Sequence, residues 1–157
     1  PFYGCYMLRP SWALGFDDPE NPSSLEKIIR AVGGEPVAYA GRTKCCGFPI
    51  ILEKEAIAVA MAGTNMKDAR EHGADFMVTP CPLCHMGLHI YQERAGRAVK
   101  TELNLPILHL PQLLGLAMGI PAQDLGLSRH LISVDRIVTR LQNPDTTPPS
   151  LPAEPRT

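Results

Sequence analysis

Apolar residues at helical spacing mark the first predicted helix. They lie three or four positions apart, at Leu25, Ile28, Ile29 and Val32. Ser23-Ser24-Leu25-Glu26 precedes them and has the form of a capping box, in which Ser and Glu side chains bind free N–H groups of the first turn. Gly33-Gly34 ends the pattern. We therefore expect a helix from about residue 23 to residue 32.

A longer run of small and apolar residues predicts a second helix between Leu52 and His72. Its packing face is formed by residues at helical spacing: Leu52, Ala56, Val59, Ala60, Gly63 and Met66. Gly73 can end this helix because glycine adopts the left-handed conformation without strain. The small side chains on this face favour close packing against a neighbour.

Three short apolar stretches read as strands, at residues 36–40, 74–79 and 106–110. Helical patterns follow the last two: one opens at Pro82 and runs toward Arg94, and another covers residues 111–119. Ser133 can cap a further short helix through Leu141. Alternating strands and helices predict an α/β fold, with a small, mainly parallel sheet flanked by helices. Ligands of such sheets collect beyond the carboxyl ends of the strands.

The end of the chain has a different composition. Residues 143–157 contain five prolines and almost no apolar side chains, which predicts a disordered Pro-rich tail. Residues 1–142 are long enough for one domain. Because Pro1 is not an initiator Met and a cysteine follows four residues later, we expect the chain to be part of a longer protein.

Charge and hydropathy exclude several classes of function. The net charge of −1 gives no field to attract nucleic acid or an anionic membrane. No apolar run approaches the length of about 20 residues that a transmembrane helix needs, and no signal peptide is recognisable. The sequence predicts a cytoplasmic protein that reaches a membrane only through partner subunits.

Five cysteines are the main chemical feature of the sequence: Cys5, Cys45, Cys46, Cys81 and Cys84. Gaps of 39 and 34 residues separate their three groups, about one strand–helix unit each, so all three can reach one edge of the sheet. An odd number that includes an adjacent pair is a poor disulfide framework and is more typical of metal binding in a reducing compartment.

The residue pattern leaves the identity of the metal open. A structural zinc ion takes four ligands, and four of the five cysteines could supply them. Adjacent cysteines serve two metal atoms more easily than one, so an iron–sulfur cluster uses the whole set better. Two other readings remain: inert buried thiols, and a redox dithiol at Cys81-Pro82-Leu83-Cys84.

Histidines near these cysteines are weaker candidates. His85 and His89 are four residues apart and could face one side of a helix as metal ligands, although a solvated or core-packed pair is commoner. His109 ends a predicted strand at the same edge and could donate a proton to a departing thiolate. His72 and His130 are expected at the surface.

Two further groups could serve the cysteine site. Arg42 and Lys44 could offset the charge of a thiolate-bound cluster, although solvated loop charges are the simpler expectation. Trp12 and Phe16 could cover the cluster or contact a partner. The simpler expectation is that one of these aromatic side chains is buried and anchors the loop.

The cysteine pattern and its surroundings resemble a known family. The segments that carry the resemblance are Tyr3-Gly4-Cys5, Phe16-Asp17-Asp18-Pro19-Glu20-Asn21-Pro22, Cys45-Cys46-Gly47, Cys81-Pro82-Leu83-Cys84 and Leu110-Pro111-Gln112-Leu113-Leu114-Gly115-Leu116. Over most of residues 1–120 the chain is similar to the CCG, or cysteine-rich, domain of the heterodisulfide reductase B-subunit family. The segments look like the second, C-terminal copy of the two that family members usually carry.

The resemblance implies an oxidoreductase subunit in which the five cysteines bind a non-cubane [4Fe–4S] cluster. A small-molecule disulfide would be cleaved there with electrons from flavin and ferredoxin-type iron–sulfur subunits. Relatives also serve in succinate dehydrogenase and in lactate or glycolate oxidation complexes, so a structural or electron-relay module holding zinc or iron–sulfur is the alternative.

Overall fold

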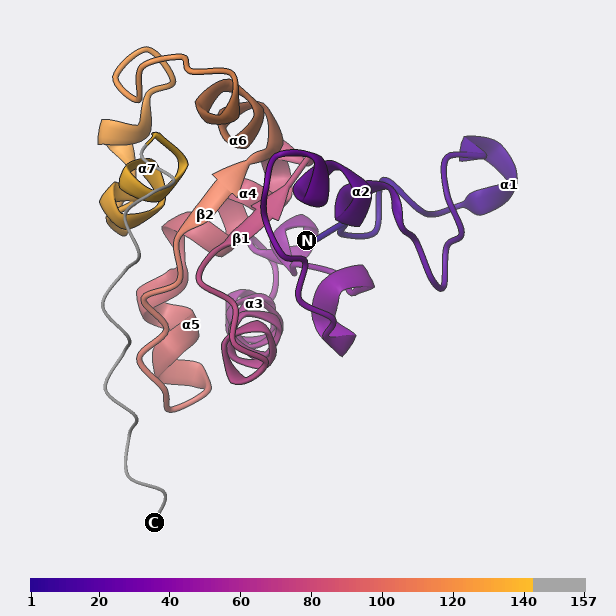
Figure 1. The fold of residues 1–157 in the computed structure, drawn as a ribbon. Coiled ribbons are helices and arrows are strands. Elements are labelled where there is room, and N and C mark those ends of the chain that lie inside the picture. Colours follow the sequence, from indigo (N-terminus) through magenta and orange to yellow (C-terminus); the bar gives the residue numbers. More distant parts are fainter. Residues whose placement is uncertain (143–157) are drawn as a thin grey trace.

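Two short parallel strands lie at the centre of the fold (Figure 1). The structure is a computed structural model that describes residues 1–142, and the predicted Pro-rich tail lies outside them. β1 (Met77–Thr79) pairs with β2 (Ile107–His109), with Met77 opposite Ile107. Parallel strands need a crossover connection, and here α4 (Pro82–Ile90) and α5 (Gln92–Ala98) supply it. The predicted α/β class is confirmed.

Most of the predicted helices form near their expected positions. In chain order the remaining helical elements are α1 (Ser11–Leu14), α2 (Ser24–Ala31), η1 (Ala40–Thr43), η2 (Phe48–Ile50), α3 (Glu55–Glu71), α6 (Leu110–Ala117), η3 (Leu127–Arg129) and α7 (Asp135–Gln142), where η denotes a 3₁₀ helix. The helix predicted toward Arg94 is divided at Tyr91 into α4 and α5. Leu52 lies before α3 and is 95% exposed, so its predicted packing role is wrong.

The two strands separate two apolar cores because their side chains alternate between the faces of the sheet. Met77 and Ile107 face a core shared with α3, α4 and α5, whereas Val78 and Leu108 face a second core formed by α2, α6 and α7. In Figure 1, α3 and α5 lie below the strands and α6 and α7 lie above them. Both faces of this small sheet are therefore buried.

The sheet is smaller than the sequence predicts. Residues 36–39 have no regular structure, and η1 follows them, so the strand predicted at 36–40 is wrong. The N-terminal segment occupies the place beside β1 instead: Phe2 N–H donates to the Val78 carbonyl at 2.8 Å, and Tyr3 N–H donates to the Arg42 carbonyl at 2.8 Å. Single hydrogen bonds of this kind fix neighbouring segments without extending the ladder.

The capping box predicted for α2 does not form. Instead, the Asp17 carboxylate accepts hydrogen bonds from the Ser23 and Ser24 N–H groups at 2.9 and 2.8 Å and from the Ser24 hydroxyl at 2.6 Å. Glu26, the acidic residue of the predicted box, binds Arg42 at 2.7 Å and accepts a hydrogen bond from the Tyr3 hydroxyl. A side chain six residues upstream thus caps the helix.

Residues 9–22, which we call the arm, carry α1 away from the rest of the molecule (Figure 1). Trp12 is 88% exposed and Phe16 is 47% exposed, so neither is the buried anchor expected by default. An ion pair of 3.0 Å between Arg9 and Glu20 holds the base of the arm. None of the helices within residues 1–142 combines the length and apolar character needed to cross a bilayer.

Candidate metal centre

Three segments bring the five cysteines together. Cys5 follows the buried N-terminal segment, Cys45 and Cys46 follow η1, Cys81 is the N-cap of α4, and Cys84 lies in its first turn. Pro82 opens α4 as predicted, because its missing N–H would have no partner at that position. Only the last pair follows a strand of the sheet.

The thiols form a continuous series of neighbours. Neighbouring thiols influence one another's ionisation: Cys45 affects the pKa of Cys5, Cys45 and Cys84 affect that of Cys46, and Cys46 and Cys81 affect that of Cys84. All five are free thiols. Gly4 permits this approach, because a Cβ at that position would lie 2.6 Å from the Cys84 Sγ. The structure therefore gathers all the cysteines predicted to act together.

Burial and mutual contact set the acidity of these thiols. A hydrogen bond from Cys84 lowers the pKa of Cys46 to about 7, against the opposing effect of burial. The same hydrogen bond, together with burial, raises the pKa of Cys84 well above its ordinary value. Burial and the neighbouring Cys45 also raise the pKa of Cys5. The first turn of a helix lowers the pKa of a thiol, but at Cys84 these contacts outweigh that effect.

The Cys45–Cys46 loop is held against α3. Asn65, 3% exposed, donates from Nδ2 to the Cys45 carbonyl at 2.9 Å. Gly47 has φ of +85°, and a Cβ there would lie 2.5 Å from the Ala58 carbonyl oxygen. The absent side chain at Gly47 thus makes room for the α3 backbone. Asn65 was not identified from the sequence as a residue of the site. The feature that could have indicated it is a polar residue among the small side chains of a packed helix.

The charges before the cysteine pair have different environments. Arg42 is largely buried, and it donates to Glu26 at 2.7 Å and to the Pro22 carbonyl at 2.9 Å. Lys44 is exposed. Arg42 is therefore part of the packing between η1 and α2 rather than a solvated loop charge.

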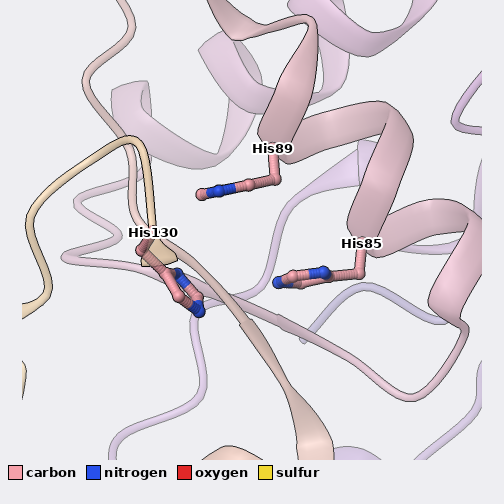
Figure 2. Close-up of side chains that lie close together, drawn as sticks. All are labelled: His85, His89 and His130. Carbon is pink, nitrogen blue, oxygen red and sulfur yellow. The ribbon is translucent and has the colours of Figure 1, made fainter. Parts of the chain in front are cut away.

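A histidine cluster forms where α4 meets the segment after η3. His85 and His89 extend side by side toward His130, which comes from the segment after η3 (Figure 2). Ring centroids are 5.3 Å apart for His85 and His89, 4.8 Å for His89 and His130, and 5.5 Å for His85 and His130. His72 is exposed as predicted, but the surface position predicted for His130 is wrong because it packs into this cluster.

His109 is the N-cap of α6. Its side chain accepts a hydrogen bond from the Gln112 N–H, and its Nε2 lies 3.0 Å from the Pro80 carbonyl oxygen. Both ring nitrogens are therefore engaged. The proton-donor role stays a prediction, and it would require His109 to leave Pro80.

The small α/β fold and the five neighbouring free cysteines together indicate a cysteine-rich domain whose functional groups are thiols. The model of the CCG cysteine-rich domain family matches residues 1–89, which contain all five cysteines. The chain belongs to this family, as the resemblance predicted.

Several curated proteins resemble the chain over most of its length. It is 44% identical over 136 residues to the 8-methylmenaquinol:fumarate reductase membrane anchor subunit of Wolinella succinogenes, covering 87% of the chain and 48% of that protein. Identity is 34% over 122 residues to a heterodisulfide reductase B-subunit-like protein of Archaeoglobus profundus, covering 74% and 40%. The B-subunit of a ferredoxin/F420H2-dependent CoB–CoM heterodisulfide reductase of Methanosarcina acetivorans is 30% identical over 132 residues, covering 83% and 44%.

These relatives are subunits of redox enzymes by name, and they include a heterodisulfide reductase B-subunit. The chain spans less than half the length of each. The family is thereby established, whereas the activity of the whole protein is a separate question.

Proposed function

We propose that the five cysteines hold an iron–sulfur cluster, of the non-cubane [4Fe–4S] type that the family resemblance implies. The observation that carries this proposal is the continuous series of neighbouring free thiols, which draws on all three cysteine groups. Thiolate sulfur is the usual protein ligand of such clusters. Five thiols also exceed the four that a structural zinc ion takes, so zinc is the weaker alternative.

The donor set fits a cluster chemically. Three of the thiols, Cys46, Cys81 and Cys84, are buried, while Cys5 and Cys45 are half-buried. Burial disfavours charged thiolates in contact with one another unless a cation replaces their protons. Metal binding therefore removes the cause that raises the pKa of Cys84. Cys5 and Cys45 leave the site reachable from solvent.

The proposed activity is electron transfer and reductive cleavage of a small-molecule disulfide. When bound, the cluster supplies one-electron chemistry; cleavage of a disulfide consumes two electrons and two protons and yields two thiols. The electrons would come from flavin and ferredoxin-type iron–sulfur subunits. The chain would then be one half of a protein like the heterodisulfide reductase B-subunit, with residues 1–142 forming its second, C-terminal cysteine-rich domain on the cytoplasmic side.

A second candidate function is a structural or electron-relay module in a succinate dehydrogenase or lactate/glycolate oxidase type complex. The 44% identity to a fumarate reductase membrane anchor subunit favours it. In that role the cysteine site would pass electrons or support assembly, and attachment to the membrane would come through partner subunits.

The proposed ligand set is tested by metal and sulfide analysis with EPR on anaerobically reconstituted protein. We expect about four irons and four sulfides per chain. Cys46→Ser should alter the EPR signal, and Gly4→Ala should lower iron content because its methyl group would displace the Cys84 Sγ. Gly15→Ala is the matched control, since Gly15 also has positive φ but has open space around it. One zinc ion without labile sulfide would contradict the cluster.

Turnover separates the two candidate functions. Reconstituted protein with a chemical one-electron donor should release two thiols per disulfide consumed if it is a disulfide reductase. A relay or structural module would retain its cluster and yet release none. Serine substitution of Cys46 should abolish thiol release in the first case.

A further inference from the structure

We propose that His85, His89 and His130 bind a Zn²⁺ ion at a site separate from the five cysteines. The three side chains offer ring nitrogens that all lie within 4.8 Å of one another. Two come from α4, and the third comes from the segment between η3 and α7 (Figure 2). An ion here would connect the crossover helix to the C-terminal part of the described chain.

The geometry needs little adjustment. His85 and His89 are one helical turn apart, and their rings stack at an interplanar angle of 10°, so both side chains extend in one direction. Tetrahedral zinc with Zn–N bonds of about 2.0–2.1 Å holds its nitrogens about 3.3 Å apart. Small side-chain rotations bring nitrogens within 4.8 Å of one another to that separation.

Two buried nitrogens in the cluster have no hydrogen-bond partner. They are the Nδ1 atoms of His89 and His130, and His89 as a whole is only 7% exposed. An unpaired buried polar atom costs free energy comparable to a lost hydrogen bond. A bound metal ion would give these nitrogens a partner.

Hydrogen bonds on the other ring nitrogens define what zinc binding must change. The His85 Nε2 donates to the Ile107 carbonyl at 3.1 Å, which leaves its Nδ1 with a free lone pair. The His89 Nε2 accepts from the Leu131 N–H at 3.1 Å, and the His130 Nε2 accepts from the Gln112 amide at 3.1 Å. Without zinc, both neutral rings thus carry their proton on Nδ1.

Zinc binding through the Nδ1 atoms of His89 and His130 moves the proton of each ring to Nε2. The Leu131 N–H and the Gln112 amide, which donate to these Nε2 atoms without zinc, then turn away. Leu131 can do so because it lies in an irregular segment and its side chain is 67% exposed. The Leu131 N–H is then a reporter of the bound state, since it exchanges a histidine acceptor for water.

The charge state and ligand type suit zinc. Burial lowers the pKa of His89 to about 4 and also lowers the pKa of His130, which favours the neutral form of these rings. Neutral imidazole is the form that binds metals. Three imidazoles leave a fourth position for water or substrate, as in catalytic zinc sites. Cys84 precedes His85, but adjacent helical residues point about 100° apart.

The test is a titration of ZnCl₂ into the reduced 157-residue chain, followed by NMR of the ring nitrogens of its five histidines. The signals of His85, His89 and His130 should shift together, along with the Leu131 amide, while those of the exposed His72 stay unchanged. X-ray absorption should show Zn–N scattering at about 2.0–2.1 Å.

Variants complete the test. His130→Gln and His85→Gln should each weaken zinc binding at these nitrogens roughly a hundredfold, while the exposed His72→Gln should leave it unchanged. Circular dichroism of the metal-free variants establishes that they fold. Zinc bound by sulfur alone at about 2.3 Å, with unchanged histidine signals, would overturn the proposal. It would also be overturned if both variants bound zinc as tightly as the wild type. Because binding is read at histidine nitrogens, the outcome does not depend on what the cysteines hold.

Discussion

At the scale of single residues, Asp17 caps α2 in place of the serine that the sequence predicts. Its carboxylate accepts hydrogen bonds from two N–H groups and one hydroxyl at the start of α2 and from the Asp18 N–H at 2.8 Å. Desolvation opposes ionisation, but these hydrogen bonds together outweigh it and hold the pKa of Asp17 below its usual range. The ionised carboxylate thereby stabilises the folded chain.

Replacing Asp17 with Asn should lower the free energy of unfolding by about 1 kcal/mol at neutral pH. Because the pKa of Asp17 is lower in the folded chain than in the unfolded one, its contribution is present above the ordinary pKa and is lost as pH falls below it. Urea unfolding at a series of pH values should show the gap between wild type and Asp17→Asn narrowing below about pH 4. The exposed Asp124→Asn is the control and should show no such gap.

At the scale of elements, the close approach of the Cys45–Cys46 loop to α3 constrains the position of the cysteine pair. Gly47 lies against Ala58 of α3, and Asn65 of the same helix binds the Cys45 carbonyl. The backbone of α3 cannot move away without disturbing the core that it shares with α4 and α5. The position of the cysteine pair therefore depends on one helix and one missing side chain.

Gly47→Ala should destabilise the protein by at least about 2 kcal/mol, since a strained positive φ adds to overlap with the α3 backbone. Gly33→Ala is the matched control: its φ is +81°, close to the +85° of Gly47, but its surroundings are open, so only the strain of about 1 kcal/mol applies. Thermal unfolding of the two variants measures the difference. Equal losses would mean that the loop moves away from α3 freely.

The sequence predicts elements well where the signal is local. The continuous apolar runs at 74–79 and 106–110 contain β1 and β2, because both strands are buried on both faces. The strand predicted at 36–40 fails because a strand needs a ladder partner, and the N-terminal segment takes the place beside β1. The break at Tyr91 has no Gly or Pro to mark it.

Gaps of about one strand–helix unit led us to expect that the cysteines lie together, but only Cys81 and Cys84 follow a strand of the sheet. The histidine cluster could not be predicted, because His130 lies 41 positions after His89 and reaches it only through the fold. The cap of α2 could not be predicted from the sequence either, because Asp17 reaches the start of the helix across a turn. Contacts that are distant in sequence but close in space carry no periodic signal.

At the scale of the whole molecule, the arm lies outside both cores. Trp12 is the single tryptophan of the chain and is 88% exposed. Leu14 and Phe16 are also exposed, at 45% and 47%. The apolar side chains of the arm therefore contribute little to the stability of the described domain.

Tryptophan fluorescence checks this arrangement. Emission should be red-shifted in the folded protein, and iodide should quench it nearly as well before as after unfolding in urea. Trp12→Ser should change the free energy of unfolding by no more than about 0.5 kcal/mol. Blue-shifted, protected emission would instead place the arm against the body of the molecule.

The central position of the two strands also sets a gradient of hydrogen exchange. The backbone amides of Met77–Thr79 and Ile107–His109 lie between two cores, so those that are hydrogen-bonded should exchange only when the whole domain opens. Amides of the arm should exchange through local opening. Cys5 lies between the segment bonded to β1 and the buried Leu8, which precedes the arm. Release of the first cysteine therefore also requires Leu8 to leave its contacts with Tyr3 and Leu25.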